Sequence, residues 1–131
     1  MKPDAIRRRL VCRLRQEVLD RGLKIVDEKE VRLTKELVAR FQPFVAVAAG
    51  APAGGLSATV RKRVVEALCA GPVRVWLIEG RDAIIAVRNL KVSFRREHEV
   101  HGGIEAQAIY NLLHAPDDED EAARLVEIFF P

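Results

Sequence analysis

The chain of 131 residues is long enough for one domain with a small core and too short for separate catalytic and binding halves. Apolar residues make up 49% and charged residues 31%, which indicates a globular rather than a disordered chain, and the scarcity of aromatic residues leaves the core to aliphatic packing. No apolar run approaches the roughly 20 residues of a membrane span and the basic N-terminus does not resemble a signal peptide, so we expect a cytoplasmic protein without a membrane partner.

The net charge of +3 conceals an asymmetry along the chain. Residues 1–65 carry 15 basic and 7 acidic side chains, whereas the remainder carries 7 and 12. The basic clusters "RRR" (7–9) and "RKR" (61–63) could contact phosphate groups of a nucleotide or of a nucleic acid. Solvated helix faces are the simpler explanation of such clusters, and both interpretations stay open.

The first half of the chain predicts a helix, a strand and a second, short helix. Apolar residues recur at helical spacing from Ala5 to Arg21, and the β-branched stretch 23–33 is typical of a strand. Thr34 is a candidate N-cap for a short helix that ends before Pro43. The Gly-, Ala- and Pro-rich segment 43–56 has the composition of a flexible insertion.

The second half predicts three more helices and two more strands. Ser57 is a candidate N-cap for the first of these helices, 73–80 reads as a strand, and Asp82 opens a further helix. Residues 104–110 alternate well enough for a strand, and Asp118 has the spacing of a capping box before a last helix. Helices and strands intermix without regular alternation, so we expect one α+β domain over 1–131, an antiparallel sheet with helices packed on it.

Four stretches, in this order, resemble the nucleoside diphosphate kinase family almost from end to end. They are "KPDA" (2–5), "RGLKIVDEKEVRLT" (21–34), "GPVRVWLIEG" (71–80) and "NLLHAPDDEDEAARLVEIFF" (111–130). The last stretch matches, without gaps, the family's Asn-x-x-His segment and the helix that ends in two aromatic residues. The resemblance implies a ferredoxin-like antiparallel sheet covered by helices.

The resemblance also implies an activity and its residues. In the family a histidine takes the γ-phosphoryl group of a nucleoside triphosphate and passes it to a diphosphate, and this role falls on His114. Lys2 and Arg88 match the cations on the phosphates, and Asn111 matches the asparagine that contacts the sugar. His101 corresponds to a second phosphate-binding arginine, so a permanent cation is replaced by a side chain that is mostly neutral at pH 7. Without the resemblance, Lys2 carries no signal, His114 and Arg88 are typical of solvated side chains, and Asn111 is typical of a turn.

The resemblance implies partners as well. Nucleoside di- and triphosphates are the expected substrates, Mg²⁺ is the expected cofactor and is carried by the nucleotide phosphates rather than by protein ligands, and the protein is expected to form a homo-oligomer. A nucleic-acid partner is not expected, because aromatic side chains for base stacking are few.

Several departures from the family pattern predict a weakened active site. Leu125 stands where the family has the glutamate that orients the histidine, and 115–116 read Ala-Pro instead of Gly-Ser. The aromatic residue that stacks on the base aligns near Val60 and its apolar counterpart near Ala108, so base stacking, worth roughly 1 to 3 kcal/mol, is expected to be weak.

The family also begins with a central strand just before "KPDA", and no strand fits ahead of Lys2. Either the true start lies upstream of Met1, which we favour, or the sheet repacks without its middle member. Three functions stay open: a phosphotransferase, a catalytically silent relative that binds a nucleotide or a protein, and a basic nucleic-acid-binding module.

Overall fold

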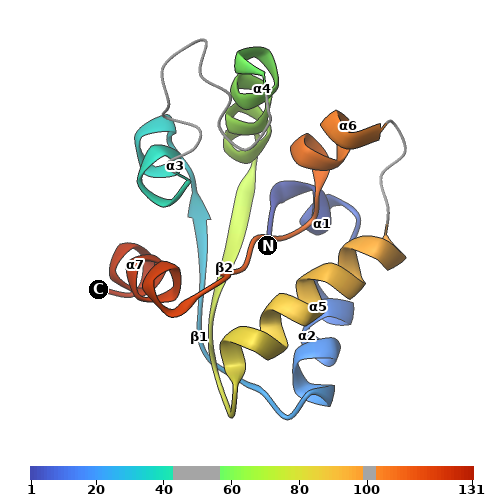
Figure 1. Ribbon diagram of the computed structural model, residues 1–131, viewed down its shortest axis with the longest axis vertical. Coiled ribbons are helices and arrows are strands. Elements are labelled where there is room, and N and C mark those ends of the chain that lie inside the picture. Colours follow the sequence, from blue (N-terminus) through green and yellow to red (C-terminus); the bar gives the residue numbers. More distant parts are fainter. Residues whose placement is uncertain (43–56, 99–102) are drawn as a thin grey trace.

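The computed structural model describes residues 1–42, 57–98 and 103–131 (Figure 1). The predicted insertion at 43–56 and the candidate residue His101 lie outside the described residues. The elements are, in chain order, α1 (Pro3–Arg7), α2 (Val11–Asp20), β1 (Lys24–Arg32), α3 (Lys35–Phe41), α4 (Ala58–Cys69), β2 (Pro72–Glu79), α5 (Ala83–Glu97), α6 (Gly103–Tyr110) and α7 (Glu119–Phe129).

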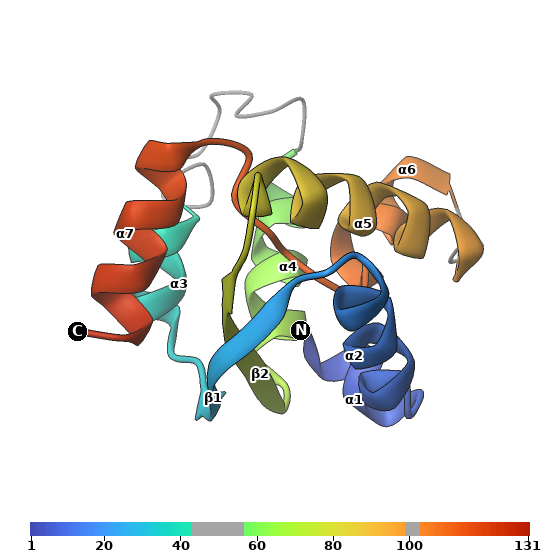
Figure 2. The same cartoon turned by 90° about the horizontal axis from the view of Figure 1, so that it is seen from below.

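In the described part of the chain the sheet consists of β1 and β2, which run antiparallel with helices on both sides. Lys24 lies opposite Glu79 at one end and Arg32 opposite Pro72 at the other. Helices α2 and α5 pack together on one side of the strands, and α3 and α7 pack together on the other side (Figures 1 and 2). Helices α4 and α6 form a third pair near the start of β2. The predicted α+β class is confirmed.

Two buried clusters hold these helix pairs to the strands. The first joins the N-terminal helices to α5 and the segment before α7, and consists of Ala5, Leu14, Val18, Leu23, Leu90, Phe94, Leu112 and Leu113. The second joins α3, α4 and α6, and consists of Leu33, Val38, Phe41, Val60, Val64, Leu68, Val73 and Ile109. Phe41 and Phe94 are the only aromatic residues in these lists, so aliphatic side chains dominate the described core, as the composition predicts.

The predicted caps and strands are largely confirmed. The side chains of Thr34 and Ser57 accept hydrogen bonds from the backbone N–H groups of Leu37 and Val60 and begin α3 and α4. The predicted strands at 23–33 and 73–80 correspond to β1 and β2 within one residue. The helix predicted to open at Asp82 is α5.

The single helix predicted from Ala5 to Arg21 is wrong, because the chain breaks between α1 and α2. Arg9 has a φ of 57°, and the backbone N–H groups of Arg9 and Leu10 donate to the carbonyls of Ile6 and Ala5. This is a Schellman cap, which usually has glycine at the left-handed position. With arginine there, the sequence carried no signal for the break.

The strand predicted at 104–110 is also wrong, because these residues form α6. Seven residues are too few to separate period 2 from period 3.6 when the residues are mostly helix formers. Packing decides the outcome: Ile109 is buried among Val60, Val64 and Leu68 of α4. A helix therefore covers α4 where a strand was expected.

Candidate active site around His114

His114 lies in the segment 111–118 that leads from α6 into α7. Asp118 is the N-cap of α7, because its side chain accepts a hydrogen bond of 2.8 Å from the backbone N–H of Glu121. The carboxylate of Glu121 in turn accepts a hydrogen bond of 2.8 Å from the backbone N–H of Asp117. The capping box predicted at Asp118, within the acidic block 117–121, is present, shifted by one residue at its second bond.

Glu121 also holds the ring of His114. Its second carboxylate oxygen lies 2.9 Å from Nε2 of His114, and the two side chains are 18% and 26% exposed. A carboxylate accepts hydrogen bonds and does not donate them, so this contact places the imidazole proton on Nε2 and leaves the lone pair on Nδ1. The ring of Phe41 lies against the same imidazole, with 6.1 Å between ring centroids.

This contact corrects the expectation that the imidazole has lost its carboxylate. Leu125 cannot orient it, but Glu121, four residues and about one helical turn earlier, takes up that position. Leu125 instead packs with the apolar residues of the second cluster. The acidic block therefore serves both the helix start and the histidine.

Burial keeps the His114 ring neutral at pH 7. Burial lowers its pKa to about 4, and the positive charges of Lys2 and Lys91 act in the same direction, whereas the carboxylate of Glu121 opposes them. A neutral ring with a free lone pair is the form in which histidine acts as a nucleophile.

Lys2 is a buried cation, and His114 lines the same cavity. The Lys2 side chain is 6% exposed, and its backbone N–H donates to the carbonyl of Leu112 at 2.9 Å. Its ammonium group makes no hydrogen bond with any residue that the structure describes. Burial, with a further contribution from the charge of Arg95, lowers the Lys2 pKa to about 7. An anion that reached this amine would find a donor that no described residue occupies.

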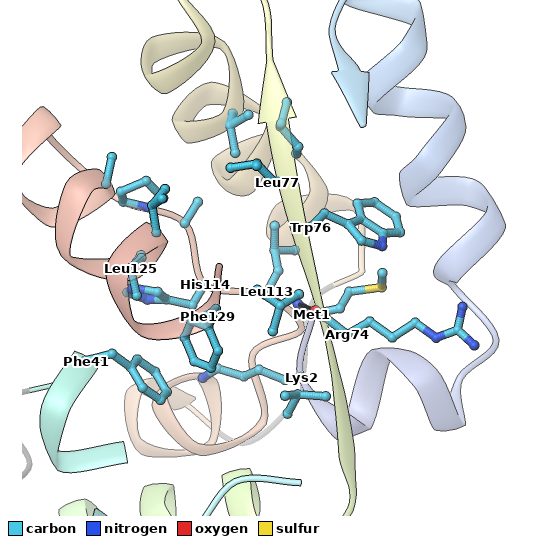
Figure 3. A pocket seen from close by; sticks show the side chains of 18 of the residues that line it. Met1, Lys2, Phe41, Arg74, Trp76, Leu77, Leu113, His114, Leu125 and Phe129 are labelled. Atoms are coloured by element: carbon cyan, nitrogen blue, oxygen red, sulfur yellow. Dashed lines mark hydrogen bonds between the residues drawn. The ribbon is translucent and has the colours of Figure 1, made fainter. Parts of the chain in front are cut away.

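The cavity between β2 and the segment 113–116 has a volume of about 230 Å³, and we call it the central cavity. It is bounded by Met1 and Lys2, by the strand residues 73–78, and by apolar side chains of α2, α5 and α7. Figure 3 shows Lys2 and His114 on the same side of β2 as Phe41 and Phe129. Because most of its lining is apolar, the polar chemistry is confined to the edge where Lys2 and His114 lie.

Arg88 does not line the central cavity. It is exposed on α5, and its charge is one of those that lower the pKa of Asp117, after the hydrogen bond and charge of Lys91 and the charge of His114. The ammonium of Lys91, three residues further along α5, donates to Asp117 at 2.6 Å and to the carbonyl of Ala115 at 3.1 Å. Helix α5 thus fixes the residues that follow His114 and presents Arg88 to solvent near them.

Asn111 also lies outside the central cavity. Its side-chain nitrogen donates to the carbonyl of Ala108 at 3.4 Å, and its side-chain oxygen is buried without a partner. Asn111, Arg7 and Tyr110 line a second, small recess, which Lys2 also lines. The structure therefore brings Lys2 together with His114 in the central cavity and with Asn111 in the small recess.

Two further sequence-based expectations concern surface contacts. Val60, which aligns near the stacking aromatic, is 3% exposed within the second cluster, so its side chain presents no face to a base. Arg61 is 4% exposed, so of the cluster 61–63 only Lys62 and Arg63 are open to solvent, whereas Arg7, Arg8 and Arg9 are all exposed.

Sequence reasoning missed Glu121, Lys91 and Arg95. The i, i+3 spacing of Arg88 and Lys91 indicates a shared helix face and could have identified Lys91. The capping-box spacing of Asp118 and Glu121 predicts only a role in the cap, because it gives no sign that the second carboxylate oxygen of Glu121 is free for another partner. Arg95, whose pKa burial lowers, donates to the carbonyl of Leu113 and carried no sequence signal.

Proteins similar to this chain are known over its whole length. The sequence profile described as nucleoside diphosphate kinase matches residues 1–131. Three curated relatives carry that name: one from Pyrococcus abyssi is 30% identical over 99% of this chain and 80% of its own length. One from Acidiphilium cryptum is 31% identical over 99% and 89%. One from Methanothermobacter thermautotrophicus is 27% identical over 99% and 83%.

A solved structure supports the fold. The chain is similar to a crystal structure of an NDP kinase from Pyrobaculum aerophilum, with a TM-score of 0.80 and 24% identity over 100% of this chain and 92% of that one. The predicted ferredoxin-like α+β fold is thereby confirmed. Among the described residues no helix is both long and apolar enough to cross a membrane.

Proposed function

Because the chain belongs to the nucleoside diphosphate kinase family, we propose that it moves the γ-phosphoryl group of a nucleoside triphosphate to a nucleoside diphosphate through a phosphohistidine at position 114. The single observation that carries this proposal is the contact of 2.9 Å between Nε2 of His114 and Glu121. It supports a fixed tautomer with the lone pair on Nδ1, and burial keeps the ring neutral against the pull of the carboxylate. An in-line attack on phosphorus requires both.

In the first half-reaction the lone pair on Nδ1 of His114 forms a bond to the γ-phosphorus. The bond from that phosphorus to the oxygen bridging to the β-phosphate breaks, and the nucleoside diphosphate leaves with its electron pair. In the second half-reaction a terminal oxygen of another diphosphate attacks the phosphohistidine and releases the imidazole. Glu121 holds the Nε2 proton throughout and stabilises the positive charge that develops on the ring.

Lys2 and Arg88 are the proposed cations on the phosphates, and Asn111 is the proposed contact to the sugar. The buried amine of Lys2 supports this role, because its pKa of about 7 lets it take up a proton when a phosphate arrives. His101, outside the described residues, is a further proposed phosphate contact.

Mg²⁺ would arrive with the nucleotide as part of the substrate. The ion is held mainly by phosphate oxygens and water and needs one or two carboxylates at most. In the described ranges, no three His, Cys, Asp or Glu side chains form a group that could hold a metal ion.

Incubation with ATP labelled at the γ-phosphate tests the proposal. We expect acid-labile, alkali-stable label on the native chain and none on His114→Asn. His98→Asn is the matched control, because His98 lies against Phe94 at the end of α5, and it should retain the label. Absence of label on the native chain would favour the second candidate, a relative that binds nucleotide or protein without turnover, to which the burial of Val60 points.

We also propose that the protein forms a homo-oligomer. Helices α2 and α5, which pack against each other, carry exposed apolar side chains at Leu19, Ile85 and Val92, with 49%, 61% and 52% exposure. Such side chains favour burial against another surface. Light scattering after gel filtration should give a mass above that of the 14.7 kDa chain, and Ile85→Asp should lower it.

A further inference from the structure

The segment between α6 and α7, which carries His114, forms neither helix nor strand. Its backbone groups therefore depend on partners from other elements. The carbonyl of Leu113 accepts a hydrogen bond from the guanidinium of Arg95. The carbonyl of Ala115 accepts one of 3.1 Å from the ammonium of Lys91. Both donors belong to α5, so this helix holds the carbonyls immediately before and after His114.

The spacing of the two donors matches the spacing of the two carbonyls. Lys91 and Arg95 are separated by about 6 Å along the axis of α5, and two residues of chain span at most about 7 Å. Because the earlier donor holds the later carbonyl, the segment runs antiparallel to α5, beside which it passes in Figure 2. Attachment at two points fixes both the position and the direction of the main chain at His114.

The imidazole of His114 is held by a different helix. Glu121 of α7 lies 2.9 Å from Nε2, whereas α5 holds the main chain on both sides of the same residue. A shift of the main chain by about 1 Å would lengthen the contact with Glu121 beyond the range of a hydrogen bond. The tautomer that Glu121 selects therefore depends on the two donors of α5.

Two buried cations are an expensive means of satisfying two carbonyls. Lys91 is 8% exposed, and burial lowers the pKa of Arg95. Burial is also the main cause of the lowered pKa values of Lys2 and His114, and the charges of Arg95 and Lys91, respectively, lower them further. A neutral amide or hydroxyl could donate to a carbonyl without this electrostatic cost. Ionisable groups held under such conditions are concentrated at functional sites.

We propose that Lys91 and Arg95 are positioning residues of phosphoryl transfer, which hold the main chain on both sides of His114 so that its Nδ1 keeps one direction. This inference rests on the proposed function. The two cations act through the backbone of the nucleophile, and Glu121 completes the arrangement at the ring. Neither cation has to contact the nucleotide for this role.

Five variants test the inference, and the first readout needs no nucleotide. Lys91→Met and Arg95→Met keep much of the apolar body of each side chain but remove its charge and its donor. Lys91→Arg and Arg95→Lys keep a charged donor, and Arg96→Met changes an exposed neighbour on α5 as the matched control. Nitrogen resonances of the His114 ring at pH 7 should show a mixture of both tautomers in each methionine variant. The native chain, the conservative variants and the control should show the proton on Nε2 alone.

The second readout is the rate at which labelled ATP transfers its γ-phosphoryl group to His114, measured by rapid quenching. Each methionine variant should lose roughly 10- to 100-fold in this rate at saturating ATP, with little change in KM, because both cations act on the main chain. The conservative variants should recover most of the rate. If a methionine variant does not fold, Lys91→Gln or Arg95→Gln takes its place, and the same changes are expected at a smaller size because the shorter amide reaches the carbonyl less well.

Folded variants that keep the single tautomer and the native rate would overturn the inference, even if their Tm falls. A higher KM at an unchanged rate would also overturn it, because that result would place the two cations on the nucleotide. Absence of label on the native chain would contradict the proposed function, whereas the tautomers of the ring would still decide whether Lys91 and Arg95 position it.

Discussion

His114 and Lys2, which both line the central cavity, differ in their hydrogen-bond partners. The ring nitrogen Nε2 of His114 has a carboxylate partner, and that carboxylate is itself held by the backbone at Asp117. The ammonium of Lys2 is more deeply buried but has no hydrogen-bond partner in the described structure, and Arg95 adds like charge beside it. The proposed nucleophile therefore has its hydrogen-bond partner in place, whereas the ammonium of Lys2, the proposed phosphate contact, has none among the described residues.

Removing the unpaired cation should have the largest effect. Lys2→Met keeps the side chain's length and apolar body, so the fold should be kept, but kcat/KM should fall by roughly 10² to 10³, the cost of losing one donor to developing charge. Lys24→Met on the exposed surface of β1 is the matched control and should leave the kinetics unchanged. Equal kinetics for Lys2→Met and the native chain would remove Lys2 from the site.

Acid should unfold the protein through the buried imidazole. The pKa of His114 is about 4 in the folded chain and about 6.5 when unfolded, so below pH 6.5 the unfolded state binds more protons. Stability should therefore be unaffected by this group above pH 6.5 and should fall as the pH drops toward 4, by up to about 3 kcal/mol.

Urea unfolding of the native chain and of His114→Gln between pH 4 and 8 measures this contribution. The difference between the two free energies of unfolding should be constant above pH 6.5 and should change below it in favour of the variant. Parallel curves over the whole range would show that the ring is not buried in its neutral form.

Removing the carboxylate of Glu121 tests how much this contact to His114 contributes to the rate. Glu121→Ala should lower kcat by roughly 10- to 100-fold, because the ring loses the partner that fixes its tautomer. The double variant with Leu125→Glu returns a carboxylate one turn further along α7, at a residue that lines the central cavity together with His114, and should recover part of the rate. A loss of stability without a loss of kcat would show that Glu121 stabilises the start of α7 and does not position His114 for the reaction.

The smallest effect on stability is expected from a change at Asp117, the exposed partner of Lys91 in their ion pair. Asp117→Asn should cost at most about 1 kcal/mol, because Asp117 is 63% exposed. The pKa of Asp117 is lowered chiefly by Lys91, so this contribution is present at neutral pH and is lost in acid as the carboxyl takes up a proton. Asp120→Asn, also at the start of α7, is the control in thermal unfolding at pH 7 and pH 3.

Local chemistry explains which parts of the fold could be predicted from the sequence. Thr34, Ser57 and Asp118 were identifiable because a side-chain cap acts within three residues. The break at Arg9 was not, since the left-handed cap is imposed by packing and lacks its usual glycine. Nor was α6, because its burial against α4 depends on residues distant in the sequence.

The candidate site likewise contains residues that the sequence indicates and residues that only the structure reveals. The resemblance indicated His114 and Lys2, and the structure brings both to one cavity. The resemblance also predicts that the His114 ring lacks a carboxylate partner, because the aligned position carries Leu125. Glu121 supplies the contact from one turn away, which only the three-dimensional arrangement reveals.

Nuclear magnetic resonance of the imidazole nitrogens of His114, recorded before and after addition of ATP, tests the central claim most directly. The account predicts a neutral ring at pH 7 with its proton on Nε2, and a phosphoryl group bonded to Nδ1 after ATP is added. A proton on Nδ1 in the free protein, or a phosphoryl group on Nε2, would contradict it.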